Sequence, residues 1–245
     1  TDYAIIAYSV QHLLNFVQAL DQWLKVFEGY THNVALNALI KPIKQGIANL
    51  DCLKINSKNL KNDPQAILEL GYFFYYQYKT QVKNLQAHFY VLDAYYSMAT
   101  AIQEYHFIFP EWVDQPTPVI EFEGAVHPLV TNAVGNDLNL NDQAGFLFLT
   151  GANMAGKSTF IKAVGVSVYL AHLGMGVPAT TMQLSLFDGL LSNINVVDNI
   201  IKGESYFFNE VQRIRNTIEK ISDGRNWLIL IDELFKGTNV QDAMK

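Results

Sequence analysis

The sequence has little cysteine, only Cys52 among 245 residues. An internal disulfide needs two cysteines, so this chain has no disulfide framework, and its composition suits a reducing compartment such as the cytoplasm. The chain has no Cys/His spacing that suits zinc. It also has no apolar run of eighteen or more residues, and the apolar stretch from Tyr3 to Val10 has no basic flank. We therefore expect neither a membrane span nor a secretory signal.

Basic residues are scarce as well. The chain has 17 Lys and Arg against 23 Asp and Glu, and its net charge is -6. A surface that neutralises nucleic-acid phosphates needs clustered Lys and Arg, so we expect any contact with DNA to lie outside this chain. The nearest basic grouping is interpreted as a solvated helix face and loop; it consists of Lys41, Lys44, Lys54, Lys58 and Lys61.

Apolar residues make up half of the chain, which is enough to bury a core in one large or two modest domains. Helical patterns fill the first part of the sequence and end near the proline-rich stretch from Pro110 to Pro118, after which strand patterns begin. We therefore predict an all-helical domain over residues 1–112 and an α/β domain over residues 113–245.

One helix start in the first domain is well marked. Asp63 is a good N-cap residue, and Pro64 suits the first helical position. Apolar residues then share one helical face; they are Ile67, Leu70, Phe74, Tyr78, Val82 and Leu85. The aromatic cluster from Tyr72 to Tyr78 could stack on nucleic-acid bases, but without accompanying Arg or Lys we favour packing between helices, with the phenolic hydroxyls at the surface.

The segment TGANMAGKST, from Thr150 to Thr159, follows the apolar run from Phe146 to Leu149 and precedes a helical pattern. Glycines at both ends of G-x-x-x-x-G-K-[ST] let the backbone curl so that N–H groups converge on a phosphate at a helix N-terminus. The alternative is an ordinary strand-to-helix turn. We predict a phosphate-binding loop for a nucleoside triphosphate that consists of Gly151, Ala152, Asn153, Met154, Ala155, Gly156, Lys157, Ser158 and Thr159, in which Ser158 is a ligand of Mg2+.

A second motif, Trp227 to Glu233, is an apolar run that ends in two carboxylates. It is typical of a buried parallel strand, and ligands of open α/β sheets lie beyond the carboxyl ends of such strands. We therefore predict that Asp232 holds Mg2+ and that Glu233 is the catalytic group that orients or deprotonates the attacking water. Taken alone, the motif also fits a strand that ends in solvated acids.

The remaining elements of the α/β region follow from local patterns. We predict strands through Ile120 and Phe122, from Val126 to Val134 and from Gly145 to Leu149. A helix should run from Lys157 to His172 and end at the glycines and proline of Gly174 to Pro178. Further expected elements are extended stretches over 183–187 and 190–196, a helix that opens near Ser205, and the strand before Asp232.

These segments resemble the MutS mismatch-repair ATPases, which belong to the wider ATP-binding-cassette (ABC) class of dimeric ATPases. The loop is similar to the family's T-G-x-N-M-x-G-K-S-T, and the segment from Asp232 to Thr238 is similar to its D-E-x-x-[RK]-G-T. Asp198 followed by GESYF from Gly203 to Phe207 resembles the family's D and G-x-S-T-F. The upstream elements His127-Pro128 and Asn136-Asp137-Leu138 match in the same order.

The resemblance implies an ABC-type P-loop NTPase, incomplete at its C-terminus, behind core and lever helices. It implies hydrolysis of ATP to ADP and phosphate with Mg2+, by a nucleotide-dependent dimer switch in mismatch repair or recombination. The dimer would be a homodimer or a dimer of paralogues that contacts double-stranded DNA through regions outside this chain, in the cytoplasm and, on DNA, at the nucleoid. In that dimer, Ser205 of one subunit would contact the γ-phosphate bound by Lys157 of the other. The alternative is that Ser205 is an ordinary helix N-cap without a role in nucleotide binding.

Several positions depart from the family pattern. Asn193 and Asn195 stand where the family has arginine and glycine, and Ala133 stands where an aromatic residue commonly stacks on adenine. His127 could take the place of that aromatic residue, but we favour a structural role for it. The chain also stops before the family's sensor histidine and its dimerising C-terminal helices, so this segment alone is not expected to catalyse hydrolysis.

Two other functions stay open. One is a nucleotide-gated scaffold that binds protein partners through its helices and has no mismatch recognition. The other, the ATPase of a membrane transporter, would need an L-S-G-G-Q-like segment where Gly203 to Phe207 stands.

Overall fold

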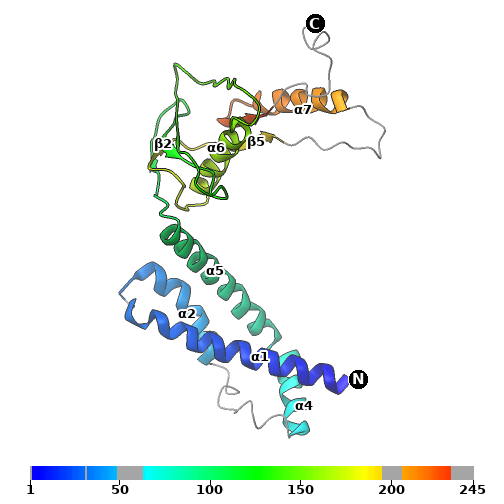
Figure 1. The fold of residues 1–245 in the computed structure, drawn as a ribbon. Helices are drawn as coiled ribbons and strands as arrows, with labels where there is room; N and C mark the ends of the chain where they lie inside the picture. The colour runs from blue at the N-terminus through cyan, green and yellow to red at the C-terminus, as the bar shows by residue number, and fades with distance from the viewer. Residues whose placement is uncertain (1, 31, 49–62, 195–205, 233–245) are drawn as a thin grey trace. The chain divides into compact units, whose positions relative to one another are not determined.

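The computed structural model describes residues 2–30, 32–48, 63–194 and 206–232. They belong to two compact units, Thr1–Met98 and Ala99–Lys245, and the division falls inside helix α5 (Lys79–Glu104) (Figure 1). The division into domains at residues 112 and 113 stays a prediction.

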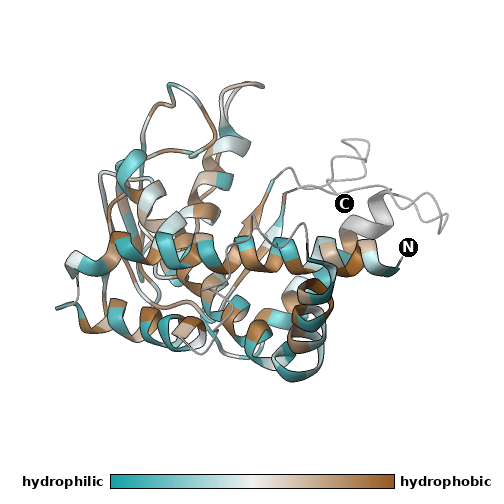
Figure 2. Cartoon of the chain, turned by 90° about the horizontal axis from the view of Figure 1, so that it is seen from below, coloured by the Kyte–Doolittle hydropathy of each residue, from teal (hydrophilic) through white to brown (hydrophobic). Residues whose placement is uncertain are grey.

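The first unit is helical in its described residues. It contains α1 (Asp2–Leu24), the 3-10 helix η1 (Lys25–Tyr30), α2 (Val34–Ala48), α4 (Pro64–Tyr72), the π-helix η3 (Phe73–Gln77) and most of α5. Its helices carry both apolar and polar residues (Figure 2), and one side of α1 is buried at three- and four-residue spacing: Val10, Leu14, Val17, Leu20 and Leu24. These side chains pack with Ile40, Ile43 and Ile47 of α2 and with residues of α4 and α5. Burial of this stripe holds the unit together.

The predicted start of α4 is confirmed. The Asp63 carboxylate accepts a hydrogen bond from the Ala66 N–H at 3.0 Å, and Pro64 is the first helical residue. The helix then widens into the π-helix, where the Tyr78 N–H donates to the Phe73 carbonyl five residues earlier, at 2.9 Å. The extra residue per turn leaves Phe74 and Tyr78 buried together with Ile67.

The predicted packing of the aromatic cluster is confirmed for part of it. Phe74 and Tyr78 are buried, and the Tyr78 hydroxyl donates to the Gly46 carbonyl at 3.1 Å, away from the surface position expected for phenols. Tyr72, Tyr75 and Tyr76 are instead at least 59% exposed, so their rings as well as their hydroxyls meet solvent.

The second unit is an α/β unit with two sheets. The larger sheet has the order β1-β4-β2-β3 and consists of β1 (Glu111–Trp112), β2 (Ile120–Ala125), β3 (Asn136–Leu140) and β4 (Thr181–Leu184). Strand β2 pairs antiparallel with β3 and β4, whereas β1 and β4 are parallel. The smaller sheet pairs β5 (Gly189–Asn193) in parallel with β6 (Trp227–Ile231).

Helix α6 (Lys157–His172) contacts β2, β5 and β6, so one helix connects both sheets. The core between them contains Phe122, Leu184, Val168, Val177 and Leu230. Gly165 lies on α6 where a Cβ would come within 2.5 Å of Leu230 Cδ1, so the absence of a side chain lets the helix approach β6 closely. The last helix among the described residues, α7 (Tyr206–Ile221), precedes β6 in the chain.

Two predicted strands are wrong. Residues 126–134 form turns, because the Val130 N–H bonds back to the His127 carbonyl and Asn132 has a φ of +54°. The strand follows this segment, as β3. Residues 145–149 belong to neither sheet in the described part of the chain, and Phe146 and Phe148 are 81% and 77% exposed. An apolar run becomes a strand only where a neighbouring strand supplies ladder partners.

Candidate phosphate-binding site

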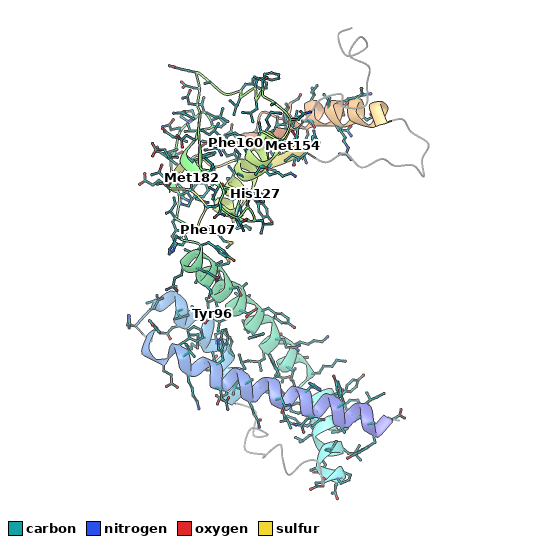
Figure 3. The ribbon with its side chains drawn as sticks, in the orientation of Figure 1. Tyr96, Phe107, His127, Met154, Phe160 and Met182 are labelled. Atoms are coloured by element: carbon teal, nitrogen blue, oxygen red, sulfur yellow. The ribbon has the colours of Figure 1, made fainter. Side chains whose placement is uncertain are left out.

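The segment between Thr150 and α6 is a tightly curled loop. Three of its residues have positive φ angles: Gly151 at +154°, Met154 at +65° and Gly156 at +89°. A Cβ added to Gly151 or Gly156 would meet nothing within 4 Å, so these glycines are needed for their backbone angles and not for space. Met154, labelled in Figure 3, adopts the left-handed region without being a glycine. Its side chain is fully exposed. The loop therefore stores backbone strain at the position where the sequence predicts phosphate binding.

Helix α6 begins directly from this loop. Gly156 is its N-cap, in the left-handed region, and no side chain caps the helix there. The Phe160 N–H makes the first helical bond, to the Gly156 carbonyl at 2.9 Å. The N–H groups of the first turn have no partner within a helix, and the helix dipole adds positive potential at the same end. An anion is the natural ligand for such a terminus.

Lys157 brings a full positive charge to the loop. Its Nζ donates to the carbonyls of Gly151 and Ala152, at 2.9 and 2.8 Å. Because an ammonium group has three N–H donors, these two bonds leave donor capacity at the loop. Ser158 is half-buried beside Lys157, and Thr159 is exposed. The structure thus brings the nine predicted loop residues together at one end of α6.

Asp232 follows the parallel strand β6, as predicted, and is half-buried. Its N–H donates to the Asn193 carbonyl at 3.2 Å, so the ends of β5 and β6 remain aligned one residue beyond the strands. Since α6 packs on β6, the loop and Asp232 belong to one packed unit. The other predicted residues of the site, Glu233 and Ser205, lie outside the described residues.

Two other residues that the sequence analysis named, His127 and Asp137, make hydrogen bonds that stabilise the local fold. His127 accepts a hydrogen bond from the Leu129 N–H at its Nδ1, at 3.3 Å, which agrees with its interpretation as a structural residue. Asp137 accepts the Gly124 N–H at 2.8 Å and ties β3 to β2. No group of three His, Cys, Asp or Glu side chains gathers among the described residues in a way that could hold a metal by itself. Within the same part of the chain, no helix is both long and apolar enough for a membrane span.

Sequence reasoning missed one pair of side chains near Asp232. The Asn193 amide donates from Nδ2 to the Thr217 hydroxyl at 3.2 Å, which connects β5 to α7. Asn193 attracted notice only as a departure from a family pattern, and Thr217 did not stand out within a helical pattern. A pairing across 24 residues leaves no signal in local periodicity.

The chain is similar to known proteins over most of its length. The family model for MutS domain V matches residues 147–245, which include the loop and β6. The DNA mismatch repair protein MSH3 of Vanderwaltozyma polyspora is 35% identical over 181 residues, which cover 69% of this chain and 17% of the relative. The DNA mismatch repair protein MutS of a Geobacillus species is 33% identical over 174 residues, with 69% and 20% covered. That of Macrococcus caseolyticus is 28% identical over 227 residues, with 88% and 26% covered. The chain therefore spans about a quarter or less of these relatives' length.

Proposed function

Because the chain belongs to the MutS family, we propose that it binds and hydrolyses ATP as a nucleotide-dependent dimer switch in DNA mismatch repair or recombination. The observation that carries this proposal is the strained loop at the uncapped start of α6, with the Lys157 ammonium held across it by two loop carbonyls. A curled backbone, a helix N-terminus and a lysine together suit the β- and γ-phosphates of a nucleoside triphosphate.

In this proposal each residue has a separate role. Residues Gly151 to Thr159 cradle the phosphates, and Lys157 neutralises their charge. Ser158 and Asp232 would hold Mg2+, whose chemistry when bound is to offset the negative charge that develops on the phosphate oxygens. Glu233 orients or deprotonates the attacking water, and Ser205 contacts the nucleotide held by the partner subunit.

The partners follow from the family. We propose a homodimer or a dimer of paralogous chains joined through this unit, with double-stranded DNA bound by regions outside the chain. The net charge of -6 supports the proposal that DNA is bound outside this chain, because the chain has no excess of basic residues with which to bind DNA phosphates.

The loop is tested by Lys157→Ala in the full-length protein, with Lys162→Ala as the matched control on the same helix. Lys157→Ala should weaken ATP binding about tenfold or more, since a charged hydrogen bond contributes about 1.5–3 kcal/mol. Lys162→Ala should leave ATP binding unchanged. Isothermal titration with ATP measures both, and equal affinities in the two variants would remove the loop assignment.

The switch is tested by sedimentation with Mg2+ and either ATP or ADP, beside Glu233→Gln. The variant should retain ATP and accumulate as a dimer, because it lacks the carboxylate that activates water. A nucleotide-bound monomer under all conditions would keep the phosphate site and refute the dimer switch. Normal hydrolysis by Glu233→Gln would refute the role of that glutamate.

A groove in the helical unit favours the second candidate function, that of a scaffold for protein partners. Its volume is about 650 Å3, and it lies between α1, α4, η3 and α5. The exposed rings of Tyr72, Tyr75 and Tyr76 line it, and tyrosines are common anchors at protein interfaces. Its charged lining residues are Lys79 and Lys83, so the groove suits an apolar helix flanked by acidic residues.

The scaffold function predicts a partner whose binding depends on those lysines. A photo-crosslinker placed at Tyr76 should capture one protein, and that protein, once purified, should bind the wild type but not the Lys79→Glu, Lys83→Glu variant. Equal binding to the wild type and the charge-reversed variant would remove this candidate function.

A further inference from the structure

A chain of hydrogen bonds joins helix α7 to Asp232. The Thr217 hydroxyl donates to the Arg213 carbonyl at 2.9 Å, one turn back on α7. The Asn193 amide donates to the same hydroxyl at 3.2 Å, and the Asn193 carbonyl accepts the Asp232 N–H, also at 3.2 Å. We refer to Thr217 and Asn193, with these bonds to α7 and to Asp232, as the Asn193 relay.

The hydrogen-bonding roles within the relay are fixed by chemistry. A hydroxyl has one proton, and the Thr217 proton points to the Arg213 carbonyl, so this hydroxyl can only accept from Asn193. The Asn193 side chain is therefore held by α7, while its main chain is held by β6. Both side chains of the relay are half-buried, so water competes less for these bonds than it would at an exposed site.

The position of Asn193 at the end of β5 lets the relay connect α7 with Asp232. Asn193 is the last residue of β5 and lies opposite Ile231, so its carbonyl meets the first residue beyond β6, which is Asp232. At the other end, α7 begins at Tyr206, next in sequence to Ser205. Thr217 lies about 17 Å along the helix from that start, at about 1.5 Å per residue. If α7 shifts as a rigid element, a displacement at its first turn would change the distance between Thr217 and Asn193.

We propose that Asn193 is a positioning residue that couples the location of α7 to the Asp232 main chain, and through it to the magnesium-binding carboxylate. This inference rests on the proposed function, because the relay would transmit contact between Ser205 and the partner's nucleotide to Asp232. Engagement of Ser205 would set α7, and the relay would then set Asp232 for hydrolysis. The Asn193 side chain does not touch the nucleotide in this arrangement.

The experiment is steady-state ATP hydrolysis by the full-length protein. Thr217→Val removes the hydroxyl at nearly constant shape, and Asn216→Ala, at the exposed neighbouring position on α7, is the matched control. Thr217→Val should lower kcat about fivefold with an unchanged KM for ATP, which is the effect of one lost hydrogen bond. Asn193→Ala should do the same, and the double variant should fall no further.

A merely structural role is separated from coupling by two more variants. Thr217→Ser keeps the hydroxyl and should restore kcat. In a Ser205→Ala background, Thr217→Val should have little further effect, because the signal that the relay carries is already absent. The inference would be overturned if the effects of Ser205→Ala and Thr217→Val on kcat were fully additive, or if Thr217→Val had the same kcat as Asn216→Ala. Either result would leave the proposed function intact. A wild-type protein that neither binds nor hydrolyses ATP would overturn the proposed function and the inference with it.

Discussion

Helix α6 is flanked by two glycines with left-handed backbones, which allows the proposed phosphate-binding loop to be tested with a matched control on the same helix. Gly156 has a φ of +89° at the start of the helix, and Gly174 has a φ of +73° just beyond its end. A Cβ added at either position would meet nothing within 4 Å. Gly156→Ala and Gly174→Ala therefore introduce backbone strain without a steric clash.

The expected magnitude follows from the cost of this conformation. An L-residue in the left-handed region costs about 1–2 kcal/mol, so the melting transition of the α/β unit should fall by about 2–8 °C in each variant. ATP affinity should separate the two. In Gly156→Ala, any partial relief of the strain turns the N–H groups of the loop away from the phosphates, so ATP binding should lose up to about 1–2 kcal/mol, which corresponds to about a 5- to 30-fold weaker Kd. Gly174→Ala should bind ATP like the wild type.

The assay combines thermal melting with isothermal titration of ATP on the full-length protein. Similar melting temperatures and a selective loss of affinity in Gly156→Ala are the expected result. If both variants are equally destabilised and both bind ATP with wild-type affinity, the curled loop has no part in nucleotide binding, and the reasoning from its φ angles is refuted.

Three further outcomes follow from described contacts. Gly189→Ala would place its Cβ against the Trp227 ring and should lower the free energy of unfolding by about 1–3 kcal/mol, measured by urea unfolding. The loss should largely disappear in a Trp227→Val background, and a loss that persists there would show that the Trp227 ring is not its cause. The pKa of Asp223 is held below its ordinary value by the Arg225 N–H and then by the Trp227 indole N–H. Ionised Asp223 therefore stabilises the fold above the ordinary pKa, and this contribution is lost as the pH falls through the folded pKa. Trp227→Phe should raise that pKa, and an unchanged NMR titration of the carboxyl would contradict it. Asp232→Asn keeps the main-chain bond to β5 and should weaken ATP binding only when Mg2+ is present; titrations with and without Mg2+ that agree would exclude a metal role.

Local signals predicted the helices well. The bounds Lys157 and His172 of α6 are confirmed, because a glycine precedes the helix and glycines with a proline follow it within a few residues. The start of α4 was equally well marked by Asp63 and Pro64. Capping is a contact between residues three positions apart, so it leaves a direct trace in the sequence.

Sheet pairing could not be predicted in the same way. The segments 126–134 and 145–149 were both predicted to be strands, but the first forms turns and the second belongs to neither sheet in the described part of the chain. Strand formation depends on partners distant in sequence, such as Gly189 and Trp227 in the smaller sheet. The same distance concealed the bond between Asn193 and Thr217.

The exposed thioether of Met154 leaves the loop before α6 open to chemical modification. Among the described methionines, Met182 is buried and Met98 and Met175 are partly covered, whereas Met154 is fully exposed. Exposure governs how readily peroxide converts methionine to its sulfoxide, so mild oxidation should mark this position first. The sulfoxide is larger and polar, and methionine sulfoxide reductases can reverse it. An oxidant would therefore modify the loop before it reached the methionines of the core.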